Sequence, residues 1–319
     1  MAAMIQIKNL RKEFGPILAV DGVSFDTPKG EVLGFLGPNG AGKSTTMKMV
    51  TGFLAPTAGT AIVCGHDVLR EPIEVKSKIG YLPEGAPLYG DMTPDGLYRF
   101  IAQVRGIPRR DRAKAIQRVV SLVRLEGVMR QPIETLSKGY KRRVGLGQAI
   151  LHDPPVLILD EPTDGLDPNQ KHDVRRLIND MASEKAIILS THILEEVDAV
   201  CTRAIVIAKG RIVADGPPAE LQARSALHNA VRLCVRAAAD AVETEMKKIT
   251  TVAGVRRVGS DNGVARCVVT AKAGAVIVDD VVSRVRARGW TVEELVVEPG
   301  RLDDVFRNLT IGTAAGASA

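Results

Sequence analysis

The chain has 319 residues, of which 45% are hydrophobic and 25% are charged; these values exclude wholesale disorder and, at roughly 150 residues per domain, indicate two domains. The formal charge of +6 permits an anionic partner such as a nucleotide, a nucleic acid or an acidic membrane, but it does not choose among them. Aromatic residues make up only 3%, too few for rows of base-stacking platforms, and no apolar run approaches the roughly 18–20 residues of a membrane-spanning helix.

The first domain is predicted over residues 1–222, where short apolar runs alternate with amphipathic segments, as in a sheet covered by helices. Buried strands are predicted where these runs are nearly all apolar, as is typical of parallel strands that are covered on both faces. They are Val32–Leu36, Val156–Leu159, Ala186–Ser190 and Ala204–Ile207. Residues 92–150 between them have apolar positions at helical spacing, which indicates a helical subdomain.

The second domain is predicted over residues 226–310, because the order of elements changes there. A turn around Asp261-Asn262-Gly263 indicates a hairpin. The expected elements are a strand at Ala230–Arg236, a helix at Ala239–Ile249, strands at Val255–Val258 and Ala265–Thr270, a helix at Ala275–Arg288 and a strand at Thr291–Val297. This order is ferredoxin-like and defines a small α+β domain. Residues 311–319 have nothing to bury and are expected to be disordered.

A glycine-rich segment follows the first buried strand and precedes a helix-forming stretch. Its residues Gly37-Pro38-Asn39-Gly40-Ala41-Gly42-Lys43-Ser44 fit the phosphate-loop pattern G-x-x-x-x-G-K-[ST]. Glycines let backbone amides curl around a phosphate, whose charge the amides and the helix end neutralise. Lys43 is expected to reach the β- and γ-phosphates and Ser44 to bind Mg²⁺. The alternative, an ordinary strand-to-helix turn, does not explain the Lys-Ser pair, so the sequence predicts a nucleoside triphosphate site.

Two carboxylates end the buried strand at residues 156–159. We expect Asp160 to hold Mg²⁺, directly or through water, and Glu161 to polarise the attacking water. A strand that merely ends in solvated acids is common in isolation. Together with a phosphate loop in the same chain, the pair is better explained as catalytic.

Leu136-Ser137-Lys138-Gly139-Tyr140 opens a helix roughly 100 residues after the phosphate loop. With these motifs the chain resembles the ATP-binding subunit of an ABC transporter, whose signature segment is usually Leu-Ser-Gly-Gly-Gln. The resemblance implies an α/β P-loop ATPase core with a mixed sheet and a helical subdomain. It also implies that Ser137 and Gly139 contact the γ-phosphate of ATP bound by an opposite subunit. Lys138 and Tyr140 depart from the family pattern.

The same resemblance assigns roles to further residues. Phe14 matches the aromatic residue that stacks on adenine, and His192 matches the switch histidine that senses the γ-phosphate. Gly165-Leu166-Asp167 resembles the segment that touches the partner subunit. Glu84 stands where the family generally has a glutamine that reaches Mg²⁺ and faces the membrane partner. The implied nucleotide-binding residues are Phe14, Gly37, Pro38, Asn39, Gly40, Ala41, Gly42, Lys43, Ser44, Thr45, Ser137 and Gly139; the Mg²⁺ residues are Ser44, Glu84 and Asp160; the catalytic residues are Glu161 and His192.

The segment GYLPEGAPLYGDMT is most similar to a bacterial branch of the family associated with gliding motility, copper-enzyme maturation and export. The resemblance implies a homodimer that encloses two ATP molecules and drives a separate multi-span permease, with the chain cytoplasmic and peripheral on the inner face of the membrane. A soluble ABC ATPase acting on nucleic acid or the ribosome is the rival. It is disfavoured because such proteins usually carry two ATPase units or long coiled coils, so no nucleic acid is expected.

The second domain has two open interpretations. It could bind a small regulator, or it could brace the dimer and dock the permease. Its helices carry mixed charge and no clustered ligands, which favours bracing.

Overall fold

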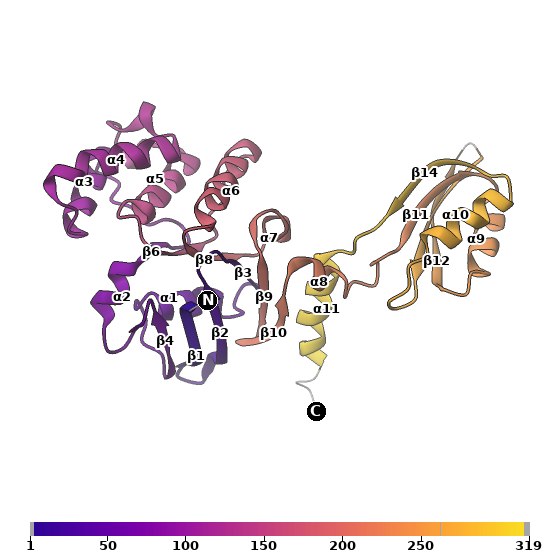
Figure 1. Cartoon of the computed structure of the whole chain (residues 1–319), viewed down its shortest axis with the longest axis horizontal. Helices are drawn as coiled ribbons and strands as arrows, with labels where there is room; N and C mark the ends of the chain where they lie inside the picture. Colours follow the sequence, from indigo (N-terminus) through magenta and orange to yellow (C-terminus); the bar gives the residue numbers. More distant parts are fainter. Residues whose placement is uncertain (1–2, 262, 316–319) are drawn as a thin grey trace. The chain divides into compact units, whose positions relative to one another are not determined.

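The computed structural model describes residues 3–261 and 263–315. Contacts divide the chain into two units, Met1–Gly216 and Pro217–Ala319 (Figure 1). The short helix α8 (Pro218–Gln222), which the sequence assigned to the first domain, belongs to the second unit because it packs against α11 (Leu302–Ala315). The division therefore falls at Gly216 rather than at residue 222.

A six-stranded mixed sheet forms the centre of the first unit. Its strand order is β10-β9-β3-β8-β7-β6, and only the edge strand β10 is antiparallel to its neighbour. The strands are β3 (Val32–Leu36), β6 (Ile79–Leu82), β7 (Val156–Asp160), β8 (Ala186–Thr191), β9 (Arg203–Ala208) and β10 (Arg211–Gly216). Every residue of β3, β7 and β8 is buried, which explains their uniformly apolar sequences. The four predicted strands and the mixed sheet are confirmed.

A second sheet in this unit is antiparallel and was not predicted from the sequence. Its order is β2-β1-β4-β5, with β1 at Ala3–Phe14, β2 at Ile17–Pro28, β4 at Ala58–Val63 and β5 at His66–Asp67. Its inner face shares a core with α1 (Lys43–Val50) and with one face of the large sheet. The helix that follows the phosphate loop is therefore packed on its apolar side.

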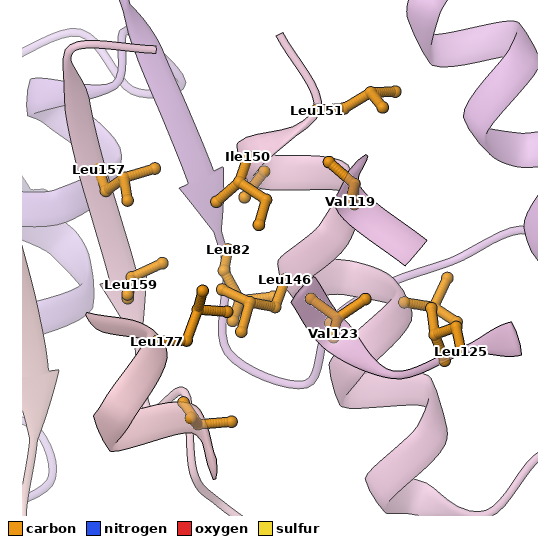
Figure 2. Packing of buried hydrophobic residues seen from close by; sticks show 14 of the residues in the cluster. Leu82, Val119, Val123, Leu125, Leu146, Ile150, Leu151, Leu157, Leu159 and Leu177 are labelled. Carbon is orange, nitrogen blue, oxygen red and sulfur yellow. The ribbon is translucent and has the colours of Figure 1, made fainter. Parts of the chain in front are cut away.

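Helices α3 (Pro94–Val104), α4 (Arg109–Val123) and α5 (Lys138–Ile150) fill the range predicted to be helical. In Figure 2, Leu146 and Ile150 of α5 lie beside Leu82 of β6, and Leu157 and Leu159 of β7 face the same core. Helix α6 (Pro168–Ala182) adds to this cluster, whereas α2 (Pro72–Lys78) and α7 (Leu194–Val200) flank the sheets. The second half of α5 is thus packed against the strands that precede the predicted catalytic groups.

The second unit has the predicted order of strands and helices. Its antiparallel sheet has the strand order β12-β13-β11-β14, and α9 and α10 share its core. The elements are β11 (Val231–Arg236), α9 (Ala239–Lys247), β12 (Val252–Asp261), β13 (Val264–Ala271), α10 (Val278–Ala287) and β14 (Thr291–Val297). Asn262, in the predicted turn, lies outside the described residues, whereas Gly263 has the positive φ of 78° that such a turn requires.

The end of the chain differs from the expectation of a disordered tail. Helix α11 continues through Ala315, so residues 311–315 are helical, and residues 316–319 lie outside the described part. The helix is anchored at its start by the buried side chains of Leu302 and Val305 and by its contacts with α8. Among the described residues, no helix combines the length and the apolar character needed to cross a membrane.

Candidate functional site

The glycine-rich loop connects β3 to α1, as predicted, and its backbone requires glycine at particular positions. Gly40 and Gly42 have φ angles of 79° and 104°, in the left-handed region that favours glycine. A Cβ atom on Gly42 would lie 2.6 Å from the carbonyl oxygen of Ala19. One on Gly37 would lie 2.6 Å from the carbonyl oxygen of Ile207. The loop is therefore built from residues that allow close backbone approach, which is what a phosphate cradle needs.

Lys43 lies at the start of α1 with its side chain buried. Its Nζ donates to the carbonyl oxygen of Gly37 at 2.6 Å and to that of Pro38 at 3.4 Å. Burial lowers the pKa of Lys43, whereas the nearby carboxylates of Glu161, Asp160 and Glu84 act in the opposite direction. The ammonium group is thus held over the loop on the side where the carboxylates lie.

A cavity of about 320 Å³ joins three of the predicted segments. It is lined by Ala19, Asn39, Gly40, Gly42, Lys43, Ser44, Thr45, Glu84 and Glu161. The loop, the glutamate after β6 and the glutamate after β7 therefore meet at one place, although they lie far apart in the sequence. Gly37, Pro38 and Ala41 belong to the same loop but do not line the cavity.

Phe14 does not line this cavity. It ends β1 with 46% of its surface exposed, and the Nζ of Lys12 lies 5.2 Å from the centre of its ring. An exposed ring can serve as a stacking platform, but the role of Phe14 beside an adenine stays a prediction.

The carboxyl ends of β7 and β8 bring Glu161 and His192 together. The Nδ1 of His192 lies 2.8 Å from Oε1 of Glu161, and the histidine side chain is 54% exposed. Glu161 itself is buried and has a positive φ of 51°, while its backbone N–H donates to Ser190. A non-glycine residue in this conformation persists only where its surroundings hold it, as they often do at functional sites.

Asp160 ends β7 with its side chain buried, and its Oδ1 has no hydrogen-bond partner. A buried carboxylate oxygen without a partner suits a metal ion, because Mg²⁺ prefers oxygen ligands. Ser44 adds a hydroxyl group at the cavity wall. Within residues 3–261 and 263–315, no group of three or more His, Cys, Asp or Glu residues could hold a metal by itself. The residues therefore fit a Mg²⁺ ion that also takes oxygens from a bound phosphate.

A buried carboxylate behind the pair of Glu161 and His192 was not predicted from the sequence. Glu196 on α7 accepts hydrogen bonds from the hydroxyl groups of Thr163 and Thr191, the latter at 2.9 Å. Burial raises the pKa of Glu196. The Thr191 hydroxyl also lies 3.5 Å from Oε2 of Glu161. The only signal in the sequence was an acidic residue among the apolar positions of α7, because the pairing depends on contacts between distant segments.

The segment around Ser137 does not reach the cavity. Ser137 is the N-cap of α5, where its Oγ accepts from the backbone N–H of Tyr140 at 3.4 Å. A Cβ on Gly139 would lie 2.2 Å from Oε1 of Gln170, at the flexible end of a side chain on α6, so the backbone of Gly139 packs closely against this helix. Asp167 caps α6, and an added Cβ on Gly165 would contact Lys138 at 3.9 Å. The two segments that the resemblance assigns to a partner subunit therefore lie side by side.

Glu84 lies at the boundary between the cavity and a neighbouring groove of about 440 Å³. The groove is lined by Lys48, Phe53, Tyr81, Leu82, Pro83, Glu84, Ala86, Pro87, Leu88, Arg105, Gly145 and Gln148. The side chain of Phe53 is largely exposed. The groove is thus partly apolar and connects directly to the residue predicted to face both Mg²⁺ and a membrane partner.

Comparisons with known proteins show the family to which this chain is similar. A family model described as "ABC transporter" matches residues 20–164. The linearmycin resistance ATP-binding protein LnrL of Bacillus subtilis (strain 168) is 31% identical over 308 residues, covering 96% of this chain and 98% of LnrL. The probable multidrug ABC transporter ATP-binding protein YbhF of Escherichia coli (strain K12) is 36% identical over 224 residues, which are 70% of this chain but only 39% of YbhF. A solved ATP-binding subunit of an ABC transporter has a TM-score of 0.65 and 29% identity over 69% of this chain and 92% of its own.

Proposed function

Since the chain belongs to the ATP-binding proteins of ABC transporters, we propose that it binds ATP with Mg²⁺ and hydrolyses it as a homodimer, and thereby drives a separate multi-span permease. The observation that carries this proposal is the cavity where the phosphate loop, Glu84 and Glu161 meet, with His192 hydrogen-bonded to Glu161. Hydrolysis requires a phosphate cradle, a metal site and a base at one place, and this cavity brings candidates for all three together.

Each group has a distinct task in this proposal. The loop amides and Lys43 neutralise the phosphates, and Ser44 and Asp160 would hold Mg²⁺, which would supply further positive charge to the bound nucleotide. Glu161 accepts a proton from the attacking water. His192, through its bond with Glu161, keeps that carboxylate oriented and presents its exposed edge to the γ-phosphate.

A second copy of the chain completes the site. Ser137 and Gly139 do not line the cavity of their own chain. In this proposal they contact the ATP that is bound in the cavity of the second copy. A two-fold axis between copies makes both sites equivalent, because each copy gives its signature segment and receives that of its partner. The start of α5, where the first backbone N–H groups have no partner further back in the helix, then lies against the γ-phosphate of the partner. Hydrolysis removes the charge that holds the copies together and opens the dimer.

Mixing two inactive variants is expected to restore activity if the site is shared. Lys43→Ala removes the phosphate contact, and Ser137→Asp keeps an N-cap residue while it places a negative charge against the γ-phosphate. Random pairing makes about half of the dimers mixed, and each mixed dimer has one intact composite site, so phosphate release should recover to about a quarter of the wild-type rate. Each variant measured alone is the control. Recovery no greater than the sum of the two variants alone contradicts a shared site.

The permease is proposed to occupy the groove beside Glu84. Its apolar wall can receive a segment of a membrane protein. Because Glu84 lines both the groove and the cavity, nucleotide binding in the cavity can change the shape of the groove. The names of the relatives, which refer to multidrug transport and linearmycin resistance, support an export direction. In this arrangement the chain works in the cytoplasm, attached to the inner face of the membrane through the permease.

Affinity purification of the chain from detergent-solubilised membranes tests this partner. We expect a multi-span protein to co-purify in near-equal amount, and Phe53→Asp to lower its recovery at least tenfold by placing a charge on the apolar wall. Ile73→Asp is the matched control, because Ile73 is 74% exposed, like Phe53 at 77%, but does not line the groove. Ribosomal proteins or DNA in place of a multi-span protein contradict the proposal and favour a soluble ABC ATPase.

The second unit is proposed to brace the dimer. Helices α8 and α11 belong to this unit, so a cut after Gly216 removes it as a whole. A chain that ends there is expected to bind ATP with unchanged affinity but to form the ATP-dependent dimer at least tenfold more weakly, as measured by analytical ultracentrifugation. Unchanged dimerisation together with unchanged transport contradicts bracing and favours the alternative in which the unit binds a regulator.

A further inference from the structure

Arg142 is a buried cation on α5 that the mechanism above does not use. Only 5% of its surface is exposed. Its guanidinium donates to three backbone carbonyl oxygens, those of Asp160 at 2.7 Å, Pro83 at 3.2 Å and Pro162 at 3.3 Å. These carbonyls belong to two separate segments, one directly after β6 and one that spans the end of β7. One side chain therefore ties the helix that begins at Ser137 to both glutamate-bearing segments.

The three acceptors have a particular relation to the site. Asp160 and Pro162 are the residues immediately before and after Glu161, and Pro83 immediately precedes Glu84. The guanidinium thus holds the backbone on both sides of the proposed base and beside the residue that faces the groove. Planar guanidinium, with its five donors in fixed directions, is suited to several acceptors at once, whereas lysine is not.

The packing of α5 alone does not require this cation. Leu146 and Ile150 already anchor the helix in the core that contains β6 and β7. Burying a cation is costly unless it is fully paired. Burial lowers the pKa of Arg142, while the carboxylates of Asp164, Asp160, Glu161 and Glu84 act in the opposite direction. These four carboxylates therefore place the buried cation beside the proposed site.

The backbone conformation of Glu161 explains why hydrogen bonds from Arg142 to its neighbours are useful. Its φ of 51° is unfavourable for a residue with a side chain, so the conformation needs support from neighbouring groups. The hydrogen bond from Glu161 N–H to Ser190 supports it on the β8 side. Arg142 supports it on the α5 side, through the carbonyls of Asp160 and Pro162.

We propose that Arg142 is a positioning residue that fixes Glu161 and the segment of Glu84 relative to the start of α5. This inference rests on the proposed ATPase function. In this proposal Arg142 acts through the backbone carbonyls that it binds and not on the nucleotide. It sets the place of the proposed base, so its loss affects the chemical step and leaves the phosphate loop as it is.

The test measures phosphate release and nucleotide affinity of the full chain. For Arg142→Gln we expect kcat to fall about 30- to 100-fold, while the Kd for ADP and the KM for ATP change less than about twofold. Arg142→Lys, which keeps the charge but loses the fork of donors, is expected to recover part of the rate. Arg118→Gln is the matched control, because Arg118 also donates to two backbone carbonyls, those of Ile150 and Leu151, but contacts neither glutamate segment.

Two further results separate positioning from mere support of the fold. In a chain that already carries Glu161→Gln, adding Arg142→Gln should change kcat by less than about twofold, because the base it positions is absent. A fold that is simply weakened would instead lose nucleotide affinity and rate together, in both backgrounds, and this result overturns the inference. If the wild-type chain and Arg118→Gln release no phosphate, the proposed function itself fails.

Discussion

Glu161→Gln is expected to reduce kcat by about 10²- to 10⁴-fold, the range typical for the loss of a general base and equivalent to about 3–5 kcal/mol of transition-state stabilisation. Glutamine has the same shape as glutamate, and its amide can still meet Nδ1 of His192, so the buried site keeps its packing. The Kd for ATP should therefore change little. Because ATP then binds without being cleaved, the closed dimer should accumulate. Phosphate release and size-exclusion chromatography with ATP measure the two effects.

The control for this variant is a glutamate nearby that has no place in the site. Glu195 lies on the same helix as Glu196 but is exposed, so Glu195→Gln should keep the full rate of hydrolysis. A normal turnover rate in Glu161→Gln contradicts the role given to Glu161. A closed dimer that forms equally without nucleotide contradicts the link between ATP and closure.

The parts of the fold that were predictable are those with a strong local signal. Parallel strands buried on both faces are apolar at every position, so β3, β7 and β8 could be identified from short runs. The phosphate loop could be identified because close backbone contacts require its glycines and because the Lys-Ser pair completes a specific pattern. In both cases the physical requirement acts on neighbouring residues.

The antiparallel sheet of the first unit gave a much weaker signal. Strand β1 is only partly buried, and its pairing with β2 has several register shifts, which break the regular alternation of polar and apolar residues. Helix α11 was missed in part because residues 311–315, Ile-Gly-Thr-Ala-Ala, include a glycine and too few apolar side chains for an amphipathic pattern. Its position depends on contacts at its start, where Leu302 and Val305 are buried.

The candidate site also has some features with a local sequence signal and others without one. Its motifs could be placed from the sequence, but the supporting contacts could not, because each joins segments that are distant in the chain. Arg142 reaches Pro83, which is 59 positions away, and Thr163 meets Glu196 across 33 positions. Nothing near Arg142 in the sequence marks it as buried, since it is one of several basic residues at the start of α5.

Lys43→Ala is expected to act on nucleotide binding itself. A charged hydrogen bond from an ammonium to a phosphate contributes about 1.5–3 kcal/mol, so its loss should raise the Kd for ATP roughly 10- to 100-fold. The effect should be larger for ATP than for ADP, because the proposed contacts reach both the β- and the γ-phosphate. Calorimetric titration of both nucleotides measures this difference. Hydrolysis should then fall because the site is empty, which is the opposite pattern to that of Glu161→Gln.

Lys48→Ala is the matched control, because Lys48 lies on the same helix but is exposed and lines the groove rather than the cavity. It removes the same charge from α1, so any general effect of net charge on nucleotide affinity appears equally in both variants. The two variants then differ in the direct contact with the phosphates, which only Lys43→Ala removes. The buried ammonium of Lys43 is at present bonded to the carbonyls of Gly37 and Pro38, and a phosphate in the loop would draw it away from them. If both variants weaken ATP equally, or if Lys43→Ala weakens ADP more than ATP, the position assigned to the γ-phosphate is wrong.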